Sequence, residues 1–302
     1  MTPGWFAVVL SWNGRDDTLA CLQSLSEVAA LTVICVDNGS TDGSIEAIRR
    51  DHPSVQLIEN GANLGFSGGN NVGIRAALDA GAEWVVLINN DATVAPDFVE
   101  AFQVAAGAWP LAGALCGKVL FADEPERIWF AGQRFSSLTG YSGRPRGYGK
   151  PDGPEFGEVV PIERAVGAFM AVSSRALAEV GLLDDHLFAY VEDVDWSLRI
   201  RAAGFELLFV PGARAWHRVS ASTGGESVST HTLYYGVRNT IAVTERHRPL
   251  PVGAASLRRL VIVATFGLHG LRRPGRARAL AAVAEGYRDA RAGRYGERSA
   301  RS

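Results

Sequence analysis

Cysteine is scarce in this 302-residue sequence. The three cysteines, Cys21, Cys35 and Cys116, are odd in number and widely spaced. They match neither a zinc-binding spacing nor a disulfide framework, and this favours a reducing compartment. Lysine is scarcer still, with Lys118 and Lys150 the only two in the chain. Its other basic side chains are arginine, apart from six histidines.

Long apolar runs and a secretion signal are also missing from the pattern. The N-terminus has no basic segment before its apolar run, and Asn13-Gly14-Arg15 interrupts that run early. No stretch reaches the roughly 18 consecutive apolar residues of a membrane span. The best run, Leu260 to Leu271, contains His269 and is too short. We therefore expect a cytoplasmic location, with peripheral contact at the inner face of the membrane as the alternative.

Apolar residues make up 47% of the chain and charged residues 21%, which allows a large core and excludes global disorder. The net charge of −2 conceals an asymmetry. Residues 1–245 carry 17 basic and 29 acidic side chains, whereas residues 246–302 carry 13 arginines and 3 acids. The sequence is thus an acidic body with a basic tail, and such a tail favours an anionic partner.

Short apolar segments alternate with helical patterns over roughly the first 110 residues, which predicts a mostly parallel sheet with helices on both faces. The expected strands are 6–12, 31–37, 55–59 and 84–88. The expected helices are 15–26, 44–50, about 70–80, and one opened by Pro96. Ligands bind at the carboxyl ends of the strands in such sheets. The polar residues that end each strand are therefore predicted to converge on one cleft.

The rest of the chain divides into an irregular middle, a second α/β region and a helical tail. Residues 121–161 are rich in Gly, Pro and Arg and predict loops or a short antiparallel insertion. Strands are expected at 165–173 and 205–210, and helices at 174–180 and 231–245. We expect one domain over 1–245, with a nucleotide-binding half of about 1–118 and an acceptor-binding half of about 119–245. A basic helical extension would cover 246–302.

Several residues in this pattern could carry chemistry. Asp37 ends the second strand and could accept a hydrogen bond from a base or a ribose hydroxyl, or could cap the next helix. The glycine-rich stretch from Asn63 to Asn70 precedes a helix and suits a diphosphate, although it is neither a Walker loop nor a dinucleotide fingerprint. Asp91 ends the fourth strand and could bind Mg²⁺ or Mn²⁺, with an N-cap as the alternative.

Three carboxylates, Glu192, Asp193 and Asp195, lie within four residues. Such a cluster suits a metal, a sugar or proton transfer, and the alternative is a solvated helix N-terminus. His217 could bind a metal or phosphate, or be structural. No serine or cysteine triad is evident.

Six stretches, in this order, together resemble glycosyltransferase family 2, whose inverting enzymes use nucleotide sugars and have the GT-A fold. The stretches are residues 8–14, 36–44, 63–71, 87–91 and 192–199, and His217 with Ser220 and Ser222. The resemblance covers about residues 5–247. Asn89-Asn90-Asp91 stands where other members have Asp-x-Asp, and this variant, like residues 234–239, is similar to bacterial rhamnosyltransferases.

The resemblance implies a role for each matching residue. Asp193, with Glu192 beside it, would be the catalytic base, and Asp91 with His217 would hold a divalent cation. Trp196 and Asp195 would bind the acceptor. The nucleotide would contact Ser11, Asn13, Asp37, Asn63, Gly65, Asn70 and Asn90. The implied fold is a Rossmann-like GT-A sheet with a C-terminal helical extension.

The implied activity is transfer of a sugar from a nucleoside-diphosphate sugar to a hydroxyl of a saccharide or lipid-linked acceptor. dTDP-rhamnose is the favoured donor and a UDP-sugar the alternative. A sugar-phosphate nucleotidyltransferase is disfavoured because only Arg15 follows the first strand. A non-catalytic nucleotide-sugar binding module would not need Asp91 and Asp193. The acidic body argues against a nucleic-acid partner. The tail would contact anionic lipid, or pack on the body or on a second subunit.

Overall fold

The computed structural model describes residues 4–135, 143–218, 229–272 and 275–298. A ten-stranded sheet crosses the body in the order β3-β2-β1-β4-β9-β6-β10-β5, with β7 paired to β6 and β8 paired to β10. The strands are β1 (Trp5–Ser11), β2 (Leu31–Asp37), β3 (Gln56–Glu59), β4 (Trp84–Asn89), β5 (Ala92–Val94), β6 (Ala112–Phe121), β7 (Ile128–Phe130), β8 (Val160–Ile162), β9 (Phe169–Ser173) and β10 (Glu206–His217).

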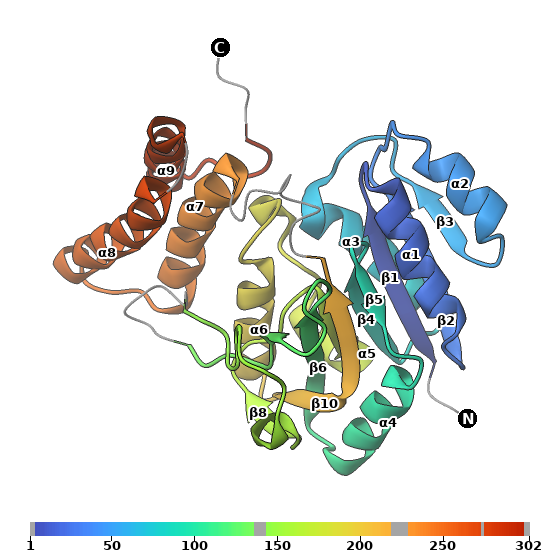
Figure 1. Ribbon diagram of the computed structural model, residues 1–302. Helices are drawn as coiled ribbons and strands as arrows, with labels where there is room; N and C mark the ends of the chain where they lie inside the picture. Colours follow the sequence, from blue (N-terminus) through green and yellow to red (C-terminus); the bar gives the residue numbers. More distant parts are fainter. Residues whose placement is uncertain (1–3, 136–142, 219–228, 273–274, 299–302) are drawn as a thin grey trace.

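Helices connect and cover these strands (Figure 1). They are α1 (Arg15–Ser26), α2 (Ser44–Asp51), α3 (Gly65–Asp79), α4 (Phe98–Ala108), α5 (Ser174–Val180), α6 (Glu192–Ala202), α7 (Thr230–His247), α8 (Val252–Leu271) and α9 (Arg276–Arg291), with 3₁₀ turns η1 (Pro154–Phe156) and η2 (Asp185–Leu187). Strands β1 to β4 pair in parallel, and β9 then pairs antiparallel with both β4 and β6. The predicted α/β fold with a helical C-terminal part is confirmed.

Helix α3 begins at Gly65 and not near Asn70, because its glycines serve packing as well as turning. A Cβ at Gly69 would lie 2.4 Å from the Leu10 side chain, and one at Gly73 would lie 2.4 Å from Val8. Both glycines therefore let α3 approach β1 closely. Much of the glycine-rich stretch that was expected to be a phosphate-binding loop is thus helix.

The pattern also missed β5 and β6, and it ended the strand that corresponds to β10 at residue 210. Every residue of β6 except the last is buried, and its Ala-Gly-Ala start has little intrinsic strand preference. Within β10, Pro211 and Gly212 form a dipeptide that usually ends a strand and begins a turn. The sheet accommodates them with a register shift between Val210 and Arg214, so the strand runs on to His217.

The three C-terminal helices form a cluster of their own. Helix α7 packs against α8 and α9 around buried residues such as Tyr235, Ile262 and Val283. Figure 1 shows these helices, orange to red, on the side of the molecule opposite the blue β2 and β3. The predicted division at residue 245 falls in the last turn of α7 and stays a prediction, as do the two halves of the body.

Helix α8 is longer than the apolar run that the sequence suggested. Its 20 residues are long and apolar enough to cross a membrane by length and composition, and only 17% of its most apolar window is buried. The expectation that this region is too short to span a bilayer was therefore wrong, because the helix extends beyond the apolar run. Length and composition alone do not decide whether a helix spans a membrane or lies on it.

Candidate active site

The carboxyl ends of the parallel strands meet at one edge of the sheet. In register, Ser11 of β1 is opposite Asp37 of β2, which is in turn opposite Glu59 of β3. On the other side of β1, Leu10 is opposite Asn89 of β4. The polar strand ends therefore lie along one edge, as predicted, and their convergence on one cleft stays a prediction. This edge is where a ligand would bind in such a fold.

Asp37 is fully buried at the end of β2. Its Oδ1 accepts hydrogen bonds from the backbone N–H groups of Gly39 and Ser40, at 3.0 and 2.9 Å. Its Oδ2 is buried and has no hydrogen-bond partner among the described residues. One oxygen thus shapes the turn, and the other can accept a bond from a ligand.

Ser11, Asn13 and Asn90 mainly hold the loops around this edge. The Ser11 hydroxyl is buried and lies 3.0 Å from the hydroxyl of Thr18, which also accepts from Asn90 Nδ2 at 2.9 Å. Asn13 Oδ1 accepts from the Thr41 backbone N–H at 2.8 Å. These contacts fix the strand ends, and a direct nucleotide contact by these side chains stays a prediction.

Asn63, Gly65 and Asn70 shape the start of α3. Asn63 Oδ1 accepts from Gly65 N–H at 2.8 Å and from Asn38 Nδ2 at 2.9 Å. Asn70 is buried, and its Nδ2 donates to the Phe66 carbonyl at 2.9 Å. The structure brings these residues close to the carboxyl edge of β2, and their contact with a nucleotide stays a prediction.

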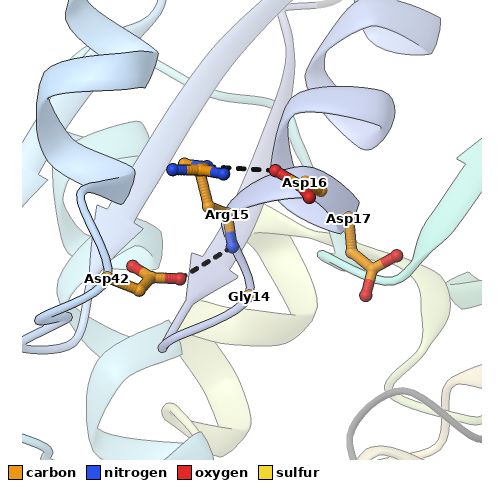
Figure 2. A pocket seen from close by; sticks show the side chains of 5 residues that line it. All are labelled: Gly14, Arg15, Asp16, Asp17 and Asp42. Carbon is orange, nitrogen blue, oxygen red and sulfur yellow. Dashed lines mark hydrogen bonds and ion pairs between the residues drawn. The ribbon is translucent and has the colours of Figure 1, made fainter.

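An acidic hollow lies beside the end of β1 (Figure 2). It is lined by Gly14, Arg15, Asp16, Asp17 and Asp42. The Arg15 side chain donates to Asp16 at 3.0 Å, and its backbone N–H donates to Asp42 at 3.0 Å. Asp17 also accepts from Arg218 at 2.7 Å, so three carboxylates stand against two guanidinium groups. The remaining negative charge makes this hollow poorly suited to hold a diphosphate without additional positive charge.

Asp91 and His217 are brought together by the pairing of β5 with β10. Ala92 is opposite His217 in that antiparallel pair, so the carboxylate just before β5 lies beside the imidazole at the end of β10. The His217 Nε2 atom is 2.9 Å from Asp91 Oδ1, and both residues are at least 93% buried. Ser220 and Ser222, which belonged to the same motif, lie outside the described residues.

Of the polar side-chain atoms of this pair, only His217 Nε2 has a hydrogen-bond partner among the described residues, Asn89 Nδ2 at 3.3 Å. Both carboxylate oxygens of Asp91, Nδ1 of His217 and Oδ1 of Asn89 are buried without a partner among the described residues. His217 Nε2 and Asp91 Oδ1 are close enough for an ion pair, but their orientation does not make a hydrogen bond. A carboxylate oxygen and an imidazole nitrogen lone pair this close repel each other unless a proton or a cation lies between them. The donor set of carboxylate, imidazole and amide oxygen fits Mn²⁺ or Mg²⁺.

Glu192 and Asp193 form the first turn of α6 and are both buried. Arg164 donates to both oxygens of Asp193, at 3.1 and 2.9 Å, and the Gly167 N–H lies 3.3 Å from Asp193 Oδ2. The sequence did not single out Arg164, because it stands alone in an irregular segment and only the fold brings it to the carboxylate.

The two carboxylates have different environments. Burial, followed by the charge of Asp193, raises the pKa of Glu192 to about 8. Its Oε2 is buried without a hydrogen-bond partner among the described residues. At neutral pH Glu192 is therefore largely neutral, while Asp193 faces the fixed charge of Arg164.

Residues 167 and 168 connect the two groups of side chains. Gly167 donates to Asp193, and the next carbonyl, that of Ala168, accepts from the Asn89 N–H at 3.1 Å. A Cβ at Gly167 would lie 3.2 Å from the Phe66 ring near the start of α3. One short segment thus contacts Asp193, the end of β4 and the glycine-rich end of α3.

Asp195 and Trp196 do not face this site, contrary to the expectation that they bind the acceptor. Both are fully buried. Trp196 packs in the core and donates Nε1 to the Gly181 carbonyl at 3.0 Å. Burial opposes ionisation of Asp195, but the hydrogen bond from His247 and the charge of Arg199 outweigh it and lower the pKa of Asp195. Their partners hold these two side chains in the interior, where they stabilise α6.

A second group of possible metal ligands was not anticipated. One ligand atom each from Asp184, Asp185 and His186 lies within 4.8 Å of the others. Asp184 already pairs with Arg246 at 2.7 Å, and Asp185 and His186 are exposed. We assign no function to this group.

The cysteines supply no nucleophile. All three are free and buried, and burial raises the pKa of Cys35 and of Cys116 to about 12. A thiol with such a pKa is not ionised at neutral pH, so covalent catalysis by cysteine is not supported.

Residues 6–173 match the family model for glycosyl transferase family 2. The chain belongs to this family. The matched part contains β1 to β9, hence the Asp37 turn, the start of α3 and Asp91.

The family 2 chain also has curated relatives. It is 32% identical over 242 residues to N-acetylglucosaminyl-diphospho-decaprenol L-rhamnosyltransferase of Mycobacterium tuberculosis, covering 74% of this chain and 78% of the relative. It is 23% identical to the dTDP-rhamnosyl transferase RfbF of Shigella flexneri, covering 83% of each. The chain is a glycosyltransferase similar to rhamnosyltransferases.

Solved structures support the fold of this family 2 enzyme. The mannosyltransferase PcManGT from Pyrobaculum calidifontis, solved with GDP-Man and Mn²⁺, is 18% identical with a TM-score of 0.57, covering 97% of this chain and 76% of that one. S. aureus TarS 1-349 with UDP is 13% identical with a TM-score of 0.55, covering 95% and 87%. At these identities the likeness shows the GT-A fold alone.

Proposed function

We propose that this glycosyltransferase moves L-rhamnose from dTDP-rhamnose to a hydroxyl of a saccharide or lipid-linked acceptor, with inversion at the anomeric carbon. The observation that carries the proposal is the bridge at residues 167–168, which contacts Asp193 on one side and the strand end preceding Asp91 on the other. The names of the curated relatives support rhamnose as the sugar. A UDP-sugar is the alternative donor.

Asp193 is the general base of the proposed reaction. It accepts the proton of the acceptor hydroxyl while that oxygen attacks the anomeric carbon, and the bond to the leaving diphosphate breaks on the opposite face. Arg164 and the Gly167 N–H fix the carboxylate in one orientation. Glu192, neutral through its raised pKa, adds no second negative charge at neutral pH. One displacement inverts the anomer.

The donor side consists of the free Asp37 oxygen and the Asp91–His217 pair. Asp37 Oδ2 would accept a bond from the base or ribose. Asp91 and His217 would hold Mn²⁺ or Mg²⁺, which would offset charge on the leaving diphosphate. The acidic hollow beside β1 makes such a counter-charge more necessary.

Nucleotide binding can be tested by thermal shift with dTDP, UDP and GDP, each with and without Mn²⁺. We expect dTDP or UDP to raise Tm, and the rise to be larger with Mn²⁺ than with the metal or the nucleotide alone. In Asp91→Asn the synergy with Mn²⁺ should be lost. A nucleotide shift that is the same with and without Mn²⁺ in the wild-type protein would remove the metal role from Asp91 and His217.

A lipid-linked acceptor fits an exposed apolar surface on α8. The α8 stripe, defined as Leu257, Leu260, Leu268 and Leu271, follows the helical period, and each of these leucines is at least half exposed. The opposite side of α8 is buried against α7 and α9. To span the bilayer, α8 would have to take its packing partners α7 and α9, which carry several charged side chains, into the lipid at high cost. We therefore favour a helix that lies on the membrane over one that spans it.

The charge around the α8 stripe is complementary to anionic lipid. Residues 246–284 contain eight arginines and no acidic residue. Of these, Arg246 and Arg259 form ion pairs with other parts of the chain and Arg258 is buried, so they contribute less to this surface. Basic residues near a membrane surface each contribute roughly 1 kcal/mol of attraction to anionic lipid. The proposed arrangement places the enzyme at the cytoplasmic face of the membrane, next to a lipid-linked acceptor. A second copy of the chain on the same stripe is the competing arrangement.

A further inference from the structure

The segment that leads into α6 has an unusual backbone. Phe188, Tyr190 and Val191 have φ values of 64°, 66° and 72°. Phe188, with ψ of −61°, and the 2.8 Å bond from Ala189 N–H to the Leu187 carbonyl form the rarer, strained type of γ-turn. Val191 is β-branched and seldom adopts a positive φ. Such conformations persist only where surrounding contacts hold them.

Asn239 of α7 supplies the first of these contacts. It is fully buried, and its Nδ2 lies 2.9, 2.8 and 2.8 Å from the carbonyl oxygens of Leu187, Ala189 and Tyr190. The two hydrogens of a single amide group therefore serve three carbonyls of the strained segment, one hydrogen being shared between two of them. Only one orientation of the amide places its hydrogens there.

Arg238 fixes that orientation and adds a second contact. Its Nε donates to Asn239 Oδ1 at 2.9 Å, which leaves the amide NH₂ directed at the segment. Its Nη2 donates to the Leu187 carbonyl at 2.9 Å, and its Nη1 to the Gly296 carbonyl at 2.7 Å. The guanidinium is fully buried and lies 4.9 Å from the centre of the Tyr235 ring. Because the guanidinium is planar and rigid, this buried arginine fixes the relative positions of its three hydrogen-bond acceptors.

The other side of the segment rests on the start of α3. The Phe188 carbonyl accepts from the Ser67 N–H at 3.2 Å. A Cβ at Gly65 would lie 2.5 Å from that same carbonyl oxygen. The segment is thus held between the glycine-rich end of α3 and the Arg238–Asn239 pair of α7. The residues that follow it are Glu192 and Asp193.

We propose that Arg238 and Asn239 are positioning residues, which hold residues 187–191 in their strained conformation and thereby place the Asp193 carboxylate. They contact no proposed substrate group and act through the backbone of the segment. The proposal rests on the proposed function, because it assigns the pair a role in presenting the general base. It predicts that loss of the pair slows the chemical step and leaves nucleotide binding unchanged.

Asn239→Asp tests this directly. The variant keeps the shape and the oxygen that Arg238 Nε contacts, and replaces the donors to three carbonyls with an acceptor. We expect kcat for sugar transfer to fall on the order of 100-fold, as for a misplaced reacting group, with the Kd for the nucleoside diphosphate within about twofold of wild type. The matched control is Thr244→Val on the same helix, because the Thr244 hydroxyl is buried without a partner among the described residues. It should retain both values.

A second readout needs no enzyme activity. Amide hydrogen exchange over residues 188–195 should become faster in Asn239→Asp and stay unchanged in Thr244→Val, with β1 and β4 unaffected in both. If the wild-type protein transfers no sugar, the proposed function fails, while exchange still tests the role of the pair. If Asn239→Asp does not fold, Arg238→Lys replaces it in both measurements. Lysine keeps the positive charge but lacks the three separate donor nitrogens of the guanidinium.

A rescue separates positioning from general stability. Val191→Gly allows the positive φ without strain, so it should restore part of the lost kcat in the Asn239→Asp background. Unchanged exchange and unchanged kcat in Asn239→Asp would overturn the proposal. A parallel loss of kcat and nucleotide affinity that Val191→Gly does not relieve would also overturn it.

Discussion

At the scale of single residues, two neighbouring carboxylates differ because of what surrounds them. Asp193 is held by the Arg164 guanidinium, whereas no hydrogen-bond partner among the described residues reaches Glu192 Oε2. Such a division of environments is how enzymes assign different protonation states to adjacent acids. The proposed role of Asp193 as base rests on the family resemblance, and this difference in environment supports it.

The raised pKa of Glu192 predicts a specific dependence of stability on pH. Its folded pKa of about 8 lies above its ordinary value of 4.5, so the wild-type protein loses stability from this group as the pH rises through that interval. Glu192→Gln stays neutral throughout. We expect Tm of Glu192→Gln minus that of wild type to be near zero at pH 4.5 and to reach at least about 2 °C at pH 8.

Differential scanning fluorimetry across that pH range measures the difference. The control is Glu158→Gln, because Glu158 is exposed and its substitution should give a difference independent of pH. A Tm difference for Glu192→Gln that is flat from pH 4.5 to 8 would show that Glu192 is ionised in the folded protein.

Sequence reasoning identified residue types well and side-chain directions poorly. Trp196 and Asp195 belong to a motif that also contains Asp193, and the pattern gave no reason to separate them. Trp196 packs in the core and donates to the Gly181 carbonyl, and the Asp195 carboxylate pairs with Arg199 and His247. Burial is a property of the folded neighbourhood, so the sequence alone did not reveal it.

At the scale of elements, the start of α3 depends on Gly65. Its φ is +75°, and an added Cβ would lie 2.5 Å from the Phe188 carbonyl oxygen. Gly65→Ala should therefore cost more than the roughly 1–2 kcal/mol of placing alanine in a left-handed conformation. It should also disturb the segment that precedes Glu192.

Gly61→Ala is the matched control for this substitution. Gly61 has φ of +68° and open space around its Cβ position, so alanine there meets only the backbone cost. Urea denaturation of both variants measures the free energy of unfolding. Equal losses in the two variants would mean that the contact between α3 and Phe188 is not as close as described.

The α8 stripe is the second feature at this scale. We expect the full-length protein to bind vesicles that contain an anionic lipid, to bind neutral vesicles weakly, and to be released by salt. Leu260→Ser with Leu268→Ser should reduce binding at least tenfold, since each buried leucine contributes roughly 1.5–3 kcal/mol.

The control for the stripe is a pair of exposed apolar residues elsewhere, Val104→Ser with Leu111→Ser, which should leave vesicle binding unchanged. Vesicle sedimentation and analytical ultracentrifugation separate the possible occupants. Vesicle binding unaffected by the stripe substitutions, or a dimer that those substitutions dissociate, would contradict the lipid surface.

Strands and helices with a clear period were predictable, and elements defined by distant partners were not. The alternation over β1 to β4 gave the parallel sheet, because each strand is a compact apolar run. The short β5 exists only through its pairing with the end of β10, which lies more than a hundred residues away in sequence. That pairing, which no local pattern contains, is what joins Asp91 to His217.

At the scale of the whole molecule, the charge asymmetry of the sequence separates two surfaces. The proposed donor and base residues lie in the acidic body, and the arginine-rich, acid-free stretch of residues 246–284 lies in the C-terminal helices. Helix α7 belongs to that helical cluster and also contacts the segment before Glu192. The C-terminal helices are therefore in physical contact with the proposed active site, which their charge alone did not indicate.

The most direct test of the central claim is a transfer assay with dTDP-rhamnose and a lipid-linked saccharide acceptor, comparing wild type with Asp193→Asn. We expect wild type to release dTDP and form an inverted product. Asp193→Asn should lose about 10²- to 10⁴-fold in kcat while binding dTDP with unchanged Kd. Substantial turnover by Asp193→Asn at wild-type nucleotide affinity would contradict Asp193 as the base and with it the proposed active site.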